Sequence, residues 1–356
     1  MDKKNSTEII NKYISIFKGY NNKTIEKDKE NLKYYLNLKV LTKEENSTLN
    51  LKTKEQLRQE LSKITNKNFS LLKNVFISHK VNFGNMLIFF NNIIYYCEIL
   101  GIRNIYLNSK ISWYIKSDIK TDKIHISFIL PNNINCKSSD TLCARIRNFF
   151  CPTLIKSERR SILLKDEIKR NLSQIKTNEN DLYIYIRSGD SFASGGYRYP
   201  QAPYCFYQKI ITNFKFNDIY IISQDKKSPV TKKLLSEYPN IKYHMNSKEI
   251  DISTLINAYN LVNAVSSFSL AAISFNDNLI NLFEYNIYPL LQAIYLFHYD
   301  IDKLDRIFNV YRMKPPDEYI IKVYEWENTD EQRKLLFGDF CKNDFKKSKN
   351  TKSIFE

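Results

Sequence analysis

Apolar and polar positions alternate in blocks along the second half of the chain, and each block has the length of one strand or one helix. Short runs rich in Ile, Val, Tyr and Phe predict strands, which cover 182–187, 219–223, 241–245, 262–266 and 279–284. Apolar residues recur with helical spacing between these runs, and the predicted helices cover 203–213, 228–237, 251–260 and 268–276. Strands that alternate with helices in this way are typical of a parallel sheet, so the second half predicts a Rossmann-like domain.

The first half carries a shorter version of the same pattern. Its predicted strands lie at 74–79, 104–108 and 123–130. A loop followed by a helix is predicted at 83–101, with Gly101 ending the helix. Together these segments form a β-loop-α-β unit. The stretches 139–175 and 290–340 predict mainly helix.

These patterns divide the chain into two α/β domains, as expected for 356 residues. An N-terminal helical extension is predicted at 1–70, followed by an N-terminal Rossmann-like domain at 71–176. A C-terminal Rossmann-like domain is predicted at 177–342, and 343–356 predicts a disordered basic tail.

The chain is basic, with a formal net charge of +16, which suggests a polyanionic or phosphorylated partner. Its lysines are scattered, however, and no RNA-recognition signature accompanies them. We therefore expect a solvated Lys-rich surface and no nucleic-acid partner. The longest apolar run, 86–100, is too short to span a membrane and is interrupted by asparagines, so no membrane span is expected in this chain.

The cysteines and histidines do not form a metal-binding pattern. The six cysteines show no CxxC pair and the four histidines lie far apart, so we expect no metal site. Free thiols in a reducing compartment fit best, and residues 1–30 lack a signal peptide, which favours the cytoplasm. The alternative is the lumen of the secretory pathway, if the chain has been trimmed of an anchor. In that case Cys143 and Cys151 could form a disulfide.

An arginine stands where the most apolar strand ends. The segment DLYIYIRSGDSF reads from a buried strand through Arg187 into the turn residues Ser188, Gly189 and Asp190. A cation at the end of a buried strand needs an anionic partner. The planar guanidinium suits phosphate oxygens, and the next two backbone amides could add donors. The alternative is a structural ion pair between Arg187 and Asp190.

Two further segments place small polar residues between a strand and a helix. In NFGNMLIFF, Gly84 permits close backbone approach and Asn85 offers an amide near a helix N-terminus. In NAVSSFSLAAIS, Ser266 and Ser267 precede a helix that opens at Phe268. Two hydroxyls and the first amides of a helix can seat a phosphate without a metal. Ordinary helix caps are the alternative in both segments.

Taken together, these segments resemble motifs of the fucosyltransferase superfamily, which contains the α1,2-, α1,6- and protein O-fucosyltransferases. FGNMLIFFNNIIYYCEILG resembles its N-terminal Gly-Asn motif and the following helix. YIRSGD is similar to its His-x-Arg-x-Gly-Asp signature, and SSFS resembles its late Ser-Ser/Thr-Phe motif. The motifs agree in order and spacing, and the resemblance covers roughly residues 75–290.

The resemblance implies a GT-B-type fold, in which two Rossmann-like domains face each other across a cleft. The domain at 71–176 would lie on the acceptor side, and the domain at 177–342 would bind the nucleotide sugar. It also implies an inverting, metal-independent glycosyltransferase that transfers fucose from GDP-fucose to a glycan or protein hydroxyl. No cofactor is implied beyond this donor. Arg187 would contact the donor diphosphate, and Asn85, next to Gly84, would reach across from the other domain. Ser266, Ser267 and Phe268 would flank the phosphates.

Two carboxylates have alternative roles under this resemblance. Asp190 is the nearest candidate for the general base, although it could instead orient Arg187 or cap the turn. Asp251 lies where the superfamily often places an acidic residue that recognises guanine, and a carboxylate can accept from both N1–H and N2–H of that base. A helix cap is the alternative for Asp251.

The chain also departs from the motifs. Tyr185 stands at the usual histidine, which leaves a ring contact but removes the imidazole contact. Ser188 stands where several branches carry a second arginine, although its amide could still bind the donor together with that of Gly189. The substitution at Tyr185 favours a second hypothesis, a non-catalytic nucleotide-sugar- or glycan-binding protein on a decayed transferase fold. Retention of Arg187, Gly189, Asp190 and Ser266–Phe268 argues against decay.

Overall fold

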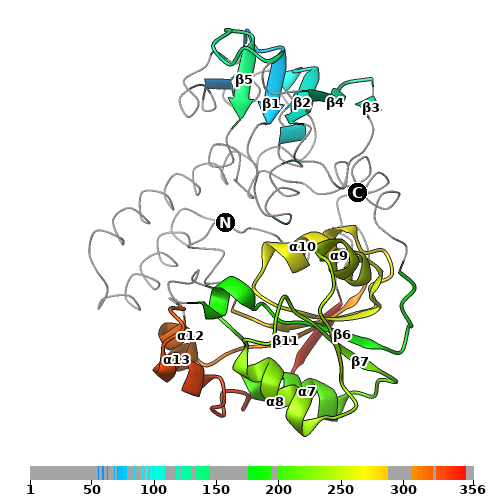
Figure 1. Ribbon diagram of the computed structural model, residues 1–356, viewed down its shortest axis with the longest axis vertical. Coiled ribbons are helices and arrows are strands. Elements are labelled where there is room, and N and C mark those ends of the chain that lie inside the picture. The colour runs from blue at the N-terminus through cyan, green and yellow to red at the C-terminus, as the bar shows by residue number, and fades with distance from the viewer. Residues whose placement is uncertain are drawn as a thin grey trace. The chain divides into compact units, whose positions relative to one another are not determined.

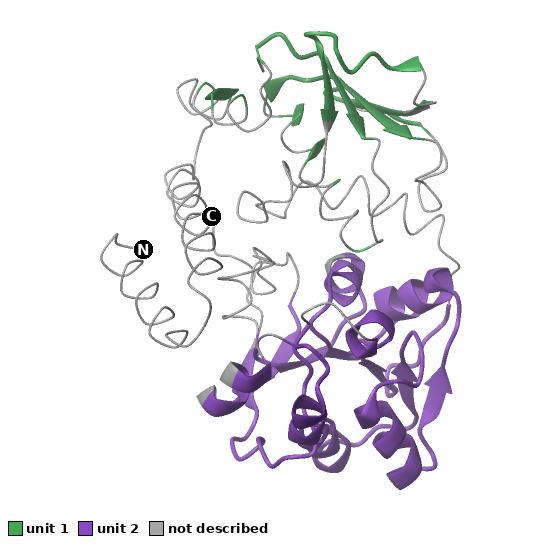
Figure 2. Cartoon of the chain, turned by 60° about the vertical axis from the view of Figure 1, so that its left-hand side comes forward, with its two compact units in different colours: residues 1–171, 291–299 green, residues 172–290, 300–356 purple. Residues whose placement is uncertain are grey.

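The computed structural model describes the second half of the chain almost completely and the first half in part. The described ranges are 71–77, 101–108, 118–120, 122–129, 133–144, 175–193, 199–287, 307–323 and 326–349, with scattered positions between 55 and 100. They belong to two compact units, which Figure 2 colours separately. Unit 1 comprises 1–171 and 291–299, and unit 2 comprises 172–290 and 300–356.

Unit 1 contains a five-stranded sheet in the order β3-β4-β2-β1-β5. Its strands are β1 (Asn74–Ile77), β2 (Asn104–Asn108), β3 (Ile119–Lys120), β4 (His125–Ile129) and β5 (Thr141–Ala144). All pairings are parallel except that of β3 with β4. The prediction of helix over 139–175 is therefore wrong for β5. A run as short as TLCA carries no readable periodicity, and pairing along β1 decides its conformation.

The helix before β2 ends where the sequence predicts. Its described residues, including Phe90 and Ile94, are helical and buried. Gly101 follows with a φ of +74°, and the amide of Ile102 donates to the carbonyl of Cys97 at 2.8 Å. This is the arrangement of a left-handed glycine that closes a helix C-terminus. The β-loop-α-β order predicted for this unit is thus present.

Unit 2 contains a seven-stranded sheet in the order β12-β11-β10-β9-β6-β7-β8. Its strands are β6 (Leu182–Tyr185), β7 (Ile219–Ile222), β8 (Lys242–His244), β9 (Asn260–Asn263), β10 (Asn281–Tyr285), β11 (Asn309–Met313) and β12 (Lys346–Lys349). Only β12 runs antiparallel to its neighbour. The parallel sheet is confirmed. The strand β11 lies inside the stretch 290–340 that was predicted to be mainly helical, so that prediction is wrong there.

Helices cover both faces of this sheet. They are α7 (Tyr204–Asn213), α8 (Pro229–Glu237), α9 (Lys248–Asn257), α10 (Ser267–Phe275), α12 (Asp317–Val323) and α13 (Asp330–Leu335). Figure 1 shows α9 and α10 together on one face and α7 with α8 on the other. This layering is that of a Rossmann-like, GT-B-like α/β fold. The arrangement of two domains across a cleft stays a prediction.

A ladder of asparagines fixes the register of the unit 2 strands. Asn281 Nδ2 donates to Asn260 Oδ1 at 2.6 Å, and Asn309 Nδ2 donates to Asn281 Oδ1 at 2.9 Å. These residues begin β9, β10 and β11 and lie opposite one another. A shift of one residue would break the ladder and move every side chain of the shifted strand to the opposite face of the sheet. The carboxyl ends of the strands are therefore held level as well.

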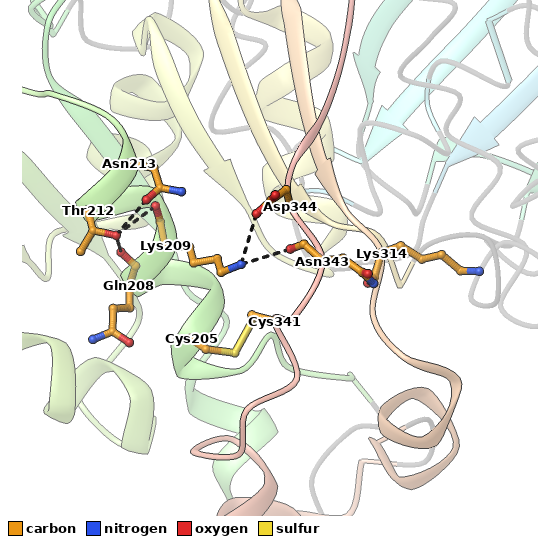
Figure 3. Close-up of polar contacts among 9 residues, drawn as sticks. All are labelled: Cys205, Gln208, Lys209, Thr212, Asn213, Lys314, Cys341, Asn343 and Asp344. Atoms are coloured by element: carbon orange, nitrogen blue, oxygen red, sulfur yellow. Dashed lines mark hydrogen bonds and ion pairs between the residues drawn. A yellow bond between two sulfur atoms is a disulfide. The ribbon is translucent and has the colours of Figure 1, made fainter.

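The C-terminal segment is part of the fold. Cys341 forms a disulfide with Cys205 in the first turn of α7, and Lys209 binds Asn343 and Asp344 (Figure 3). Phe345 packs against the rings of Phe206, Phe214 and Phe283. These contacts lead directly into β12, so the prediction of a disordered tail is wrong for Lys346–Lys349.

The prediction of free thiols is also wrong for most of the described cysteines. A second disulfide joins Cys136 to Cys143, which therefore does not pair with Cys151. Cys97 is buried as a free thiol, and Cys151 lies outside the described residues. Sequence spacing could not give these pairs, because the fold decides which cysteines meet. Of the helices that the structure describes, none has the length and apolar character of a membrane span.

Candidate functional site

Two of the predicted motif segments meet at the carboxyl edge of the unit 2 sheet. β6 and β9 are neighbouring parallel strands, with Ile184 opposite Val262. β6 leads into Arg187, and β9 leads into Ser266 at the start of α10. Ligands of open α/β sheets bind at this edge. The order of the strands therefore brings together two segments that are far apart in the sequence.

Arg187 is mostly buried and its guanidinium is already engaged. Nη2 donates to both carboxylate oxygens of Asp190, at 2.8 and 2.7 Å, and the ring of Tyr199 lies 5.0 Å from Arg187 Cζ. The side chain is 16% exposed, and among the described residues its Nε–H has no acceptor in hydrogen-bonding geometry. The structural ion pair between Arg187 and Asp190, which was the alternative to phosphate binding, is therefore present. The Nε–H donor of Arg187 is not part of this pair.

The surroundings of Arg187 keep it charged. Burial disfavours the cation, but electrostatic interactions with Tyr185, Asp190 and Tyr199 and hydrogen bonding with Tyr185 outweigh it and raise the pKa of Arg187. A permanent charge in a partly desolvated position attracts an anion more strongly than one in water. Arg187 is therefore suited to hold phosphate oxygens at the sheet edge.

Tyr185 links the two motif segments. Its ring stacks on that of Phe268, with centroids 5.6 Å apart and planes 29° from parallel. Burial raises the pKa of Tyr185, while the charge of Arg187 and hydrogen bonding with Ser266 and Arg187 act in the opposite direction. The phenol thus stays neutral in the physiological range and lies against both Arg187 and the start of α10.

The start of α10 is an N-capped helix terminus at the sheet edge. Ser266 is the N-cap, and its Oγ accepts from the amide of Phe268 at 3.2 Å. Ser269 Oγ donates to the carbonyls of Ala264 and Ser266, at 3.1 Å each, and so fixes the preceding turn. Ser267 and Phe268 are half-buried and begin the helix. The helix cap that was the alternative to a phosphate seat is therefore present. The capped helix still places its N-terminus, a favourable position for anions, at the carboxyl edge of the sheet.

Asp251 is a buried carboxylate in the first turn of α9. The residue is 8% exposed, and its Oδ1 has no hydrogen-bond partner in the part of the chain that the structure describes. Burial raises the pKa of Asp251 to about 7, although hydrogen bonds from the backbone and side chain of Asn246 oppose this. The helix cap is Ser247, whose Oγ accepts from Ile250. Asp251 is therefore not the cap, and an unpaired buried acceptor needs another explanation.

The turn after β6 is a 3₁₀ helix, η3 (Gly189–Phe192), that is held from two sides. On one side, Trp326 donates through Nε1 to the carbonyl of Ser191 at 2.7 Å, and its ring packs edge-on against Phe192. Trp326 is fully buried. This anchor could not be predicted from the sequence, because Trp326 lies 135 positions away in the chain from the residue it binds.

On the other side, η3 is held by Asp225, which follows β7. Asp225 Oδ1 accepts from Ser188 Oγ and, at 3.3 Å, from the amide of Gly189. The hydroxyl of Ser188 is therefore turned toward Asp225. Gly189 has a φ of +63°, and a Cβ there would collide with the side chain of Gln224. The left-handed backbone therefore favours glycine at this position, whereas the Gln224 side chain could move aside. Neither Asp225 nor Gln224 was predicted from the sequence.

The remaining predicted site residues belong to unit 1. Gly84 is helical and buried, whereas Asn85 lies outside the described residues. The prediction that Asn85 reaches across from the other domain stays a prediction. In the part of the chain that the structure describes, no three His, Cys, Asp or Glu side chains gather as metal ligands.

Comparison with known proteins adds a likeness of fold. No family model matches the chain, and no curated protein matches it. Among solved structures, the chain is similar to a crystal structure of the α-1,6-fucosyltransferase NodZ that was soaked with GDP-fucose. The TM-score is 0.38 at 10% sequence identity, over 61% of this chain and 96% of that chain. A likeness of this size assigns no residue. The class that the two sheets define is a mixed α/β, Rossmann-like protein with a polar site at the carboxyl edge of the second sheet.

Proposed function

We propose that the chain is an inverting glycosyltransferase of the fucosyltransferase type, with GDP-fucose as donor and a glycan or protein hydroxyl as acceptor. The observation that carries the proposal is the meeting of Arg187 with the N-terminus of α10 through Tyr185, at the carboxyl ends of β6 and β9. The ordered motifs YIRSGD and SSFS supply these residues. A charged guanidinium and a helix N-terminus are together suited to a diphosphate.

In the proposed reaction, the acceptor hydroxyl attacks the anomeric carbon as the nucleoside diphosphate departs. Negative charge grows on the leaving phosphate, and Arg187 together with the first amides of α10 would stabilise that charge where it develops. Ser267 lies at this helix end and would add a hydroxyl donor. No step in this scheme requires a metal, because the cation and the helix end supply the positive charge.

Asp190 would orient Arg187 before the donor arrives. Both of its oxygens accept from Arg187 Nη2, so the guanidinium is held at the sheet edge in the absence of phosphate. Donor binding would replace part of this ion pair. A role of Asp190 as general base remains a second proposal, which requires that the carboxylate leave Arg187 and reach the acceptor hydroxyl.

Asp251 would recognise the base. Its Oδ1 is buried and unpaired, and a carboxylate there can accept from N1–H and N2–H of guanine. The charge of Asp251 contributes to raising the pKa of both Tyr185 and Tyr243, so the carboxylate lies near the residue that links Arg187 to α10. A guanine donor is thereby favoured over uracil, adenine or cytosine.

The compartment is part of the proposal. Two disulfides among the described residues favour an oxidising environment, such as the lumen of the secretory pathway, over the cytoplasm. The cytoplasm remains the alternative if these cysteines prove to be reduced in the cell.

The proposal is tested by the thermal stability of the protein with GDP, UDP, ADP and CMP, each with and without Mg²⁺. A nucleotide at 100 times its dissociation constant adds about 2.7 kcal/mol of stability, which is easily measured. We expect stabilisation by GDP alone and no dependence on Mg²⁺. Stabilisation by UDP would reject the guanine donor, and no shift with any nucleotide would reject the proposal. Binding of GDP without turnover of GDP-fucose would favour the non-catalytic alternative.

Guanine recognition by Asp251 predicts a pH dependence of binding. The ionised carboxylate accepts both guanine protons, and a pKa of about 7 means that ionisation rises between pH 6 and pH 8. The ionised fraction grows from about 0.1 to about 0.9, so affinity should rise by about tenfold. Guanosine is the probe, since it has no titrating phosphate, and Asp251→Asn should bind it weakly at every pH. A pH dependence that persists in Asp251→Asn would exclude this role.

A further inference from the structure

We propose that Asp225 is a positioning residue, which holds the turn after β6 so that Arg187 and the amide-rich start of η3 face the diphosphate. This inference rests on the proposed function. Asp225 lies outside both motifs in the sequence. It belongs to the loop that connects β7 to α8.

One oxygen of Asp225 organises three donors. Asp225 Oδ1 accepts from Ser188 Oγ, from the Gly189 amide at 3.3 Å and from the Lys227 amide at 3.0 Å. The first two donors directly follow Arg187 in the chain. The third belongs to the loop of Asp225 itself. A single carboxylate thus ties the β7–α8 loop to the turn that carries Arg187.

The carboxylate is itself held in place. Ser223 Oγ donates to the backbone carbonyl of Asp225 at 3.1 Å, and Lys227 Nζ lies 3.6 Å from Asp225 Oδ2. Burial opposes ionisation, but hydrogen bonds from Ser188, Lys227 and Gly189 outweigh it and lower the pKa of Asp225. Asp225 is therefore ionised at neutral pH and keeps its acceptor role.

These contacts also define what Asp225 does not do. An oxygen that already accepts from three donors is a poor proton acceptor for a substrate hydroxyl, so Asp225 is unsuited to be the general base. The same contact gives Ser188 a role of its own. Several branches of the fucosyltransferase superfamily carry a second arginine at this position, whereas here the Ser188 hydroxyl donates to Asp225 and holds the turn. The left-handed conformation of Gly189 is kept by the same carboxylate.

The test separates the phosphate end of the ligand from its base. Calorimetric titration of GDP and of guanosine is compared for wild type, Asp225→Ala and Ser188→Ala. We expect Asp225→Ala to bind GDP about 10- to 100-fold more weakly, because the variant loses charge-assisted hydrogen bonds. We expect a smaller loss for Ser188→Ala. Guanosine affinity should stay within about twofold in both variants, since a misplaced turn affects only the diphosphate.

Asp218→Asn is the matched control. Asp218 directly precedes the same strand at its other end, where it pairs with Lys242 at 2.7 Å, and GDP affinity should not change. If Asp225→Ala binds GDP as wild type does, the inference is overturned while the proposed function stands. Equal losses of GDP and guanosine would also overturn it, because they indicate general disruption. If wild-type protein binds neither ligand, the proposed function itself fails.

Discussion

Replacing Arg187 by alanine is expected to lower single-turnover sugar transfer by about 10²–10³-fold, which corresponds to about 3–4 kcal/mol of activation free energy. The guanidinium is 16% exposed and kept charged by its neighbours, so it acts on the leaving phosphate through a poorly screened field. GDP-dependent thermal stabilisation should disappear in the same variant. The measurement is rapid-quench transfer from GDP-fucose with excess enzyme.

Arg187→Lys should restore only part of the rate. An ammonium keeps the charge but lacks the planar fork that binds two phosphate oxygens together. Arg333→Ala is the matched control, because Arg333 is an exposed arginine whose partners are Asn328 and Asp330 on the surface of α13. A transfer rate for Arg187→Ala within threefold of wild type, with the fold intact by circular dichroism, would exclude leaving-group stabilisation by this residue.

The sequence predicted the part of this site that depends on local pattern. The central strands β6, β9 and β10 of unit 2 are buried on both faces and read as largely apolar runs. The residues that follow parallel strands lie at one edge of the sheet. That logic placed Arg187 and Ser266 near each other before any coordinates were known. It also identified Gly101 as a helix end, because a left-handed residue at that point favours glycine.

The contacts that hold the site could not be predicted in the same way. Asp225 and Trp326 act on η3 from other parts of the chain, and nothing in their local sequence indicates a partner there. Asp225 sits in the turn sequence SQDKK, where an aspartate is ordinary. Only the order of strands, which places β7 beside β6, brings its carboxylate to Ser188.

The prediction of a disordered tail failed at β12 because long-range contacts order that segment. KKSK is basic and lacks apolar residues, so composition alone predicts disorder. The segment is ordered by what precedes it, since Phe345 enters an aromatic cluster and Cys341 is joined to α7. Lysines on an edge strand are also a common protection against pairing with another chain. The lysines of β12 therefore fit an edge strand as well as they fit a tail.

Of the two disulfides, the one between Cys205 and Cys341 is expected to contribute more to the free energy of unfolding. It joins residues 136 positions apart, and the chain-entropy model gives about 5 kcal/mol for a loop of that length. It ties α7 to the segment that carries Phe345 and β12, next to the contacts of Lys209 with Asn343 and Asp344 (Figure 3). Urea unfolding of Cys341→Ala without reductant should show a loss of this order.

Three comparisons isolate the cross-link in that experiment. Cys205→Ala and the double variant should match Cys341→Ala, because removing either partner removes the same bond. Reductant should destabilise wild type to the level of these variants, apart from the smaller effect of the second disulfide. Cys136→Ala should lose less, about 2–3 kcal/mol, because Cys136 and Cys143 are only 7 positions apart. If protein purified without reductant shows all six thiols alkylated by mass spectrometry, neither cross-link forms and the oxidising compartment is rejected with it.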